Sequence, residues 1–120
     1  MLLDSNILIY ATKPNYDYIR KFISENNCIL SVVSKIEVLG YHNLSAELKN
    51  DTETLFSLFD IISIGDTIID IAISLRQQKK MSLGDSLIAA TALVHKKTLV
   101  TANVKDFDWI EDLKIINPME

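Results

Sequence analysis

The chain has 120 residues, 48% of them apolar, with three Gly and two Pro, and this composition fits one compact domain. Its formal net charge is −4 and its isoelectric point is about 5.1, so no global basic field attracts nucleic acid, and any such contact must be local or metal-assisted. The single cysteine, Cys28, excludes an internal disulfide and a cysteine-based zinc site, and it suits a reducing cytoplasm. Because Asp4 interrupts the first apolar run, we expect no signal peptide, and no stretch is long enough to span a bilayer.

Short apolar runs along the chain predict five strands. They lie at residues 1–3, 28–33, 61–64, 98–101 and 113–116. Segments of helical period separate them. Apolar strands that alternate with helices indicate an α/β fold, in which a central parallel sheet is flanked by helices on both faces. We find no linker and no internal repeat.

Three of the intervening segments place apolar side chains at helical spacing. The predicted buried faces are Tyr16, Ile19, Phe22 and Ile23, then Ile68, Ile69, Ala72, Ile73 and Leu75, and then Leu87, Ile88, Ala89, Ala90 and Val94. Asp66 is predicted to cap the second of these helices. A further, short helix is predicted over residues 55–59.

Four acidic residues and one amide stand where predicted strands end or helices begin. Asp4 ends the first strand, Glu37 and Asp85 fall in the first turns of helices, and Asn103 and Asp106 follow the fourth strand. In a parallel sheet, strand carboxyl ends and helix N-termini share one edge, so these side chains are predicted to meet if Asp4 ends a central strand. Converging carboxylates need a cation, and hard oxygen ligands select Mg²⁺ or Mn²⁺. Such an ion positions water for attack on a phosphodiester.

Each of these acids also has a purely structural interpretation. Ser34-x-x-Glu37 and Ser82-x-x-Asp85 both match the capping box, in which a hydroxyl and the acid three residues later stabilise a helix N-terminus. The other two acids, taken singly, suit a turn at a strand end and a loop. Only the joint placement of the four acids favours a metal site.

The remaining charged residues are assigned to the protein surface. Helix caps and solvated faces account for Asp51, Asp60, Asp66 and Asp70. The pairs Lys79-Lys80 and Lys96-Lys97 suit helix ends, where the helix dipole favours positive charge, and an RNA-binding track is the alternative. The two histidines, His42 and His95, have no partner in the sequence that suggests a catalytic triad.

Five sequence blocks, taken in order, resemble the PIN domain, and in particular the small VapC-type toxins of bacterial toxin–antitoxin pairs. The blocks are LLDSNILIYA, SKIEVLG, GDSLIAATAL, LVTANVKDF and LKIINP, and they span residues 2–118. The resemblance implies a single PIN domain over residues 1–120 with a parallel sheet of about five strands. It also implies a cytoplasmic, Mg²⁺- or Mn²⁺-dependent endoribonuclease that forms a homodimer and is inhibited by a cognate antitoxin.

The resemblance further implies roles for single residues. Metal-binding acids carry over to Asp4, Glu37 and Asp85, with support from Ser5, Asn6 and Ser34. Asn103 stands where many relatives have Asp, and the nearest acid is Asp106. This departure implies a supporting role for Asn103, a catalytic role for Asp106 from farther out, and a weaker second metal.

Three other interpretations remain open at this point. A phospho-receiver domain would show paired acids after its first strand and a Lys-Pro pair after its fifth, whereas here the first acid is single and Lys114 stands apart from Pro118. A PIN-like nuclease that processes RNA outside a toxin–antitoxin pair keeps the same site. A PIN-like module retained only for binding is the third, because a fold can persist after its chemistry is lost.

Overall fold

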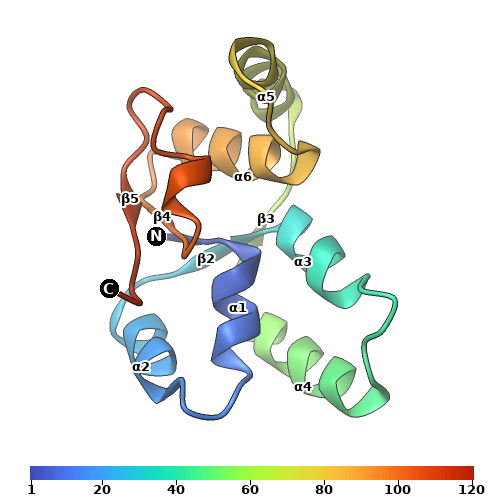
Figure 1. Ribbon diagram of the computed structural model, residues 1–120. Coiled ribbons are helices and arrows are strands. Elements are labelled where there is room, and N and C mark those ends of the chain that lie inside the picture. Colours follow the sequence, from blue (N-terminus) through green and yellow to red (C-terminus); the bar gives the residue numbers. More distant parts are fainter.

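The computed structural model describes residues 1–120, which form one five-stranded sheet flanked by six α-helices (Figure 1). The strands are β1 (Leu2–Leu3), β2 (Ile29–Ser31), β3 (Asp60–Ile62), β4 (Leu99–Val100) and β5 (Ile115–Ile116). The helices are α1 (Ser5–Ala11), α2 (Asp17–Glu25), α3 (Val32–Leu39), α4 (Ala46–Ser57), α5 (Asp66–Gln78) and α6 (Leu83–Val94), with a 3₁₀ turn η1 (Val104–Asp106). None of the helices has the length and apolar character that crossing a bilayer requires.

The strands run parallel throughout, in the spatial order β3-β2-β1-β4-β5, which confirms the predicted parallel sheet. β1 is the middle strand, with Leu2 opposite Ile29 of β2 on one side and opposite Leu99 of β4 on the other. Asp4 therefore follows the central strand, as the predicted convergence of the acids required.

The two faces of the sheet are covered by different helices, since successive strand residues point to opposite sides. Leu2 and Leu99 pack in a core with α5 and α6, whereas Leu3 and Val100 pack in a second core with α1, α2 and α4. Figure 1 shows these two groups of helices on opposite sides of the sheet. Phe107, fully buried in the first core, ties the segment after β4 to that side.

Several predicted boundaries are wrong, and side-chain caps explain two of them. The apolar run 28–33 changes from strand to helix at Ser31, whose hydroxyl accepts a hydrogen bond from the backbone N–H of Val33 at 3.1 Å and begins α3. The helix predicted over residues 55–59 is the end of α4, which begins after its cap Ser45.

Other predictions fail on α5 and at the start of the chain. Gly65, and not Asp66, is the N-cap of α5. Ile69 and Ile73 were predicted to be buried, but they are 42% and 51% exposed, so the buried face of α5 is narrower than the sequence pattern indicates. The segment that follows Asp4 is a helix, α1, which sequence periodicity did not predict.

Candidate metal centre

Asp4 lies at the middle of the carboxyl edge of the sheet, where it caps α1 and is 6% exposed. One carboxylate oxygen accepts a hydrogen bond from the backbone N–H of Ser5 and the other from the hydroxyl of Thr101, both at 2.8 Å. Thr101 directly follows β4, and its hydroxyl oxygen accepts a hydrogen bond from the backbone N–H of Asn103 at 3.0 Å. The carboxylate is therefore fixed between the ends of the two central strands.

The protonation of Asp4 reflects its burial and its neighbours. Burial is the largest effect and raises its pKa from 3.8 to about 6, although the hydrogen bonds from Thr101 and Ser5 oppose the rise. The negative charges of Asp85 and Glu37 raise the pKa of Asp4 further. A nearby cation would lower the pKa of Asp4, because it favours the ionised carboxylate.

Asp85 lies in the first turn of α6, as predicted, after the cap Ser82, whose hydroxyl accepts a hydrogen bond from the backbone N–H of Asp85 at 3.1 Å. Burial is the main cause that raises the pKa of Asp85, and a hydrogen bond with Ser82 lowers it. The charges of Asp106 and Glu37 also raise this pKa. The predicted acids from four separate segments therefore share one electrostatic environment.

Glu37 reaches this environment from the second turn of α3, and not from the first turn as predicted, because α3 begins at Val32. Its Oε1 accepts a hydrogen bond from the hydroxyl of Ser5 at 2.8 Å, and that hydroxyl also lies 3.1 Å from the hydroxyl of Ser34. Ser34 is buried inside α3, so it links α3 to α1 and does not cap the helix as the capping box predicts.

Gly84 allows Glu37 to approach α6. A Cβ placed at residue 84 would lie 2.7 Å from Oε2 of Glu37, which is closer than two such atoms can pack. The absence of a side chain at residue 84 therefore lets the glutamate carboxylate lie against the first turn of α6, next to Asp85. The sequence patterns assigned no role to Gly84 or Thr101, although the two residues lie within the blocks GDSLIAATAL and LVTANVKDF.

The remaining predicted residues lie at the margin of the site. Asp106 ends η1, is exposed, and lines a hollow of about 200 Å³ together with Asp85. Asn103 is exposed and engages the site through its backbone N–H. Asn6, in the first turn of α1, has a buried Oδ1 with no hydrogen-bond partner, and this is a neutral oxygen two residues from Asp4.

The chemistry of these groups fits a hard divalent cation, because the donors are carboxylate, hydroxyl and amide oxygens. His95, by contrast, caps the far end of α6. No three Asp, Glu, His or Cys side chains are grouped tightly enough to hold an ion between them. The metal-ligand set Asp4, Glu37 and Asp85 therefore stays a prediction.

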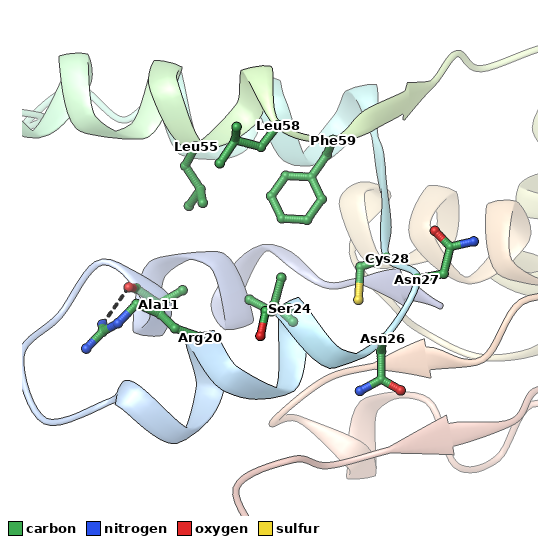
Figure 2. A pocket seen from close by; sticks show the side chains of 10 residues that line it. Ala11, Arg20, Ser24, Asn26, Asn27, Cys28, Leu55, Leu58 and Phe59 are labelled. Atoms are coloured by element: carbon green, nitrogen blue, oxygen red, sulfur yellow. Dashed lines mark hydrogen bonds between the residues drawn. The ribbon is translucent and has the colours of Figure 1, made fainter.

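A larger hollow, of about 470 Å³, lies away from the acids, between α2 and α4 (Figure 2). It is mostly apolar and is lined near its rim by Leu58, which is 75% exposed. The guanidinium of Arg20 closes one end by donating a hydrogen bond to the backbone oxygen of Ala11 at 2.8 Å. Asn27 and Cys28 precede β2, so this groove lies at the amino edge of the sheet, opposite the acidic site.

Fold and site together define an α/β protein with an acidic cluster at the carboxyl edge of a parallel sheet. The sequence model of the PIN domain matches residues 1–112, and the chain belongs to this family, as the sequence blocks indicated. Family membership also rules out the phospho-receiver interpretation. A comparison with curated proteins finds no match.

Solved structures of toxin–antitoxin complexes are similar to this chain. A toxin–antitoxin complex from Klebsiella pneumoniae matches with a TM-score of 0.79 and 29% identity, covering 98% of this chain and 96% of that one. VapBC2 from Rickettsia felis, bound to a promoter DNA fragment, matches with a TM-score of 0.78 and 25% identity over 97% and 96%. VapBC-1 from nontypeable Haemophilus influenzae shares the fold, with a TM-score of 0.83 and 24% identity over 99% and 98%.

Proposed function

We propose that this chain is a metal-dependent endoribonuclease of the VapC type, which hydrolyses RNA phosphodiester bonds with Mg²⁺ or Mn²⁺. The observation that carries the proposal is Asp4, a carboxylate held in place by two hydrogen bonds, buried, and repelled by the charges of Asp85 and Glu37. Burying a carboxylate beside like charges is unfavourable unless a cation compensates it. The PIN family match over residues 1–112 supports the same chemistry.

Each residue of the site has a proposed role. Asp4, Glu37 and Asp85 would hold the ion, and Asp106 would act from farther out. When bound, the ion would polarise the phosphodiester and its attacking water. Ser5 orients Asp4 through its N–H and Glu37 through its hydroxyl, while Thr101 fixes the second oxygen of Asp4. Ser34, Asn6 and Asn103 support these positions.

Cleavage of RNA tests the proposal directly. Purified protein should cut single-stranded or looped RNA with Mg²⁺ or Mn²⁺, and a chelator should abolish cleavage. Asp85→Asn should lower turnover by orders of magnitude while the protein stays folded, because this change removes a ligand charge without opening a core cavity. Parental cleavage rates in both Asp85→Asn and Asp4→Asn would show that the catalytic assignment is wrong.

A second candidate, a PIN-like module that binds without catalysis, is favoured by one observation: the acids are not drawn together into a group of three ligands. Calorimetry with Mn²⁺ separates the two candidates. Saturable Mn²⁺ binding that Asp4→Asn abolishes supports the nuclease. Absence of any metal response supports the binding module.

We also propose that the chain is the toxin of a toxin–antitoxin pair. The support is its likeness, over nearly the whole chain, to solved toxin–antitoxin complexes. An antitoxin would present Arg or Lys to the acidic site, where a cation compensates the carboxylates. The apolar groove between α2 and α4 is suited to an apolar segment of the same partner (Figure 2). Expression alone should arrest growth, and co-expression of the adjacent gene product should relieve the arrest.

The homodimer implied by the family resemblance belongs to the same proposal. Ile69 and Ile73 of α5 and Leu83 of α6 are exposed apolar side chains around a largely apolar hollow, and a second copy would cover them. A nuclease that processes RNA outside such a pair keeps the same chemistry. Absence of growth arrest, together with absence of a complex with the adjacent gene product, would favour that alternative.

A further inference from the structure

A cluster of lysines lies beside the acidic site, although the chain as a whole carries a net charge of −4. Lys79 is the C-cap residue of α5, Lys80 follows it in the connection to α6, and Lys105 lies in η1. The three lysines line the hollow of about 200 Å³ that Asp85 and Asp106 also line. The positive charge of this hollow therefore comes from two segments, the connection between α5 and α6 and the turn η1.

These lysines are not neutralised by acids within the protein. The ion pairs of the structure are Arg20–Asp17, Lys21–Glu25 and Lys49–Glu53, and none includes a lysine of the hollow. All three lysines are exposed, so their charges are available to a ligand. A local group of unpaired cations attracts an anionic chain even when the protein as a whole is negatively charged.

Trp109 forms the wall of the hollow and positions one of the lysines. Its indole N–H donates a hydrogen bond to the backbone oxygen of Asp106 at 3.0 Å, which fixes the ring against η1. The ammonium group of Lys79 lies 5.5 Å from the centroid of this ring, a distance at which a cation and an aromatic face attract each other. This contact favours a position of the exposed Lys79 side chain at the hollow.

We propose that Lys79, Lys80 and Lys105 form a phosphate-binding subsite for single-stranded RNA, next to the acidic site. The proposal rests on the proposed nuclease function for its substrate. The hollow, of about 200 Å³, has room for a phosphate group of the backbone. With one phosphate on the lysines, the adjacent stretch of backbone extends to Asp85 and Asp106. Binding through phosphates carries no base preference, so this subsite positions the RNA and does not select its sequence.

The chain offers a matched control for the test. Lys96, Lys97 and Lys114 are also exposed, belong to none of the ion pairs, and line another hollow. They immediately precede β4 and β5, so they lie at the amino edge of the sheet, opposite the acidic site. Changing either set of three lysines to Gln removes the same charge from the protein.

The first measurement is binding of a fluorescent single-stranded oligoribonucleotide in chelator, where no cleavage occurs. Each phosphate contact contributes about 0.7 to the slope of log affinity against log salt. Between about 50 mM and about 200 mM salt, one phosphate bound by the lysines should cost the parent about 2.6-fold in affinity beyond the loss of the Lys79→Gln, Lys80→Gln, Lys105→Gln variant. The Lys96→Gln, Lys97→Gln, Lys114→Gln control should keep the parental salt dependence. In cleavage assays the first variant should raise KM and leave kcat unchanged at saturating RNA.

The outcomes separate this proposal from the proposed function. If the parent binds RNA through the three lysines but cuts none with Mg²⁺ or Mn²⁺, the subsite stands and the nuclease function fails. If the parent cuts RNA but the variant keeps the parental KM and salt dependence, the subsite is wrong. Equal weakening in the control would assign the effect to net charge, and no RNA binding by the parent would also overturn the proposal.

Discussion

Asp4→Asn should inactivate the protein and at the same time make its metal-free form more stable. Asn has nearly the shape of Asp and keeps an oxygen that can accept the hydrogen bond from the backbone N–H of Ser5. Its amide can donate to the hydroxyl of Thr101, because that oxygen has two lone pairs and accepts one hydrogen bond already, from Asn103. The substitution therefore removes a buried charge and leaves few polar groups unpaired.

The size of the effect follows from the pKa of Asp4, which is raised from 3.8 to about 6. Since a tenfold change in proton affinity is worth about 1.4 kcal/mol, the ionised carboxylate costs the folded protein about 3 kcal/mol near neutral pH. For a chain of 120 residues this corresponds to a rise in Tm on the order of 10 °C in the variant.

The pH dependence has a defined sign. Because the folded protein binds the Asp4 proton more tightly than the unfolded chain does, this group makes the parent less stable as the pH rises from about 4 to about 6. Above that range the destabilisation is complete and constant. The advantage of Asp4→Asn over the parent should thus be largest near neutral pH and should vanish only below about pH 3, where Asp4 is protonated in both the folded and the unfolded protein.

Thermal unfolding in the presence of a chelator, followed across this pH range, measures the effect. Asp70→Asn is the matched control, because Asp70 is an exposed residue of α5 and undergoes the same change of charge. Added Mn²⁺ should stabilise the parent and Asp70→Asn but not Asp4→Asn. If Asp4→Asn unfolds at the parental temperature at every pH, burial does not destabilise the Asp4 carboxylate and the electrostatic reasoning about the site is refuted.

Three further predictions concern the rest of the site and the partner surface. Asp106→Asn should weaken metal affinity by about 10- to 100-fold, as expected for a residue that supports the metal ligands without binding the ion itself. High Mg²⁺ should restore RNA cleavage. A loss of cleavage that equals that of Asp4→Asn and that Mg²⁺ does not restore would make Asp106 a direct ligand. Gly84→Ala should displace the flexible carboxylate of Glu37, because the new Cβ would lie 2.7 Å from it. Titration with Mn²⁺ should then show weaker binding, with little change in Tm. Unchanged Mn²⁺ affinity would remove Glu37 from the ligand set. Leu58→Glu, in the apolar groove, should weaken the complex with the adjacent gene product in a pull-down while RNA cleavage persists, and an undiminished complex would place the partner elsewhere.

The sequence by itself determined the class of the fold and pointed to the acidic residues of the candidate site. Near-continuous apolar strands alternating with helices require a parallel sheet, because only helices on both faces can bury such strands. Parallel strands in turn bring their carboxyl ends to one edge, so Asp4, Asp85 and Asp106 could be assigned to that edge before their distances were known. These conclusions depend on local patterns and on a general rule of topology.

Only the tertiary structure decided how the acids are held and what surrounds them. The hydroxyl of Thr101 reaches Asp4 across 97 residues of sequence, and Gly84 matters only because Glu37 of another helix approaches it. Ser34 matched a capping box, yet the earlier hydroxyl of Ser31 caps α3 and leaves Ser34 to contact α1. Such contacts depend on the relative placement of elements that are distant in the chain, and local sequence patterns carry no information about that placement.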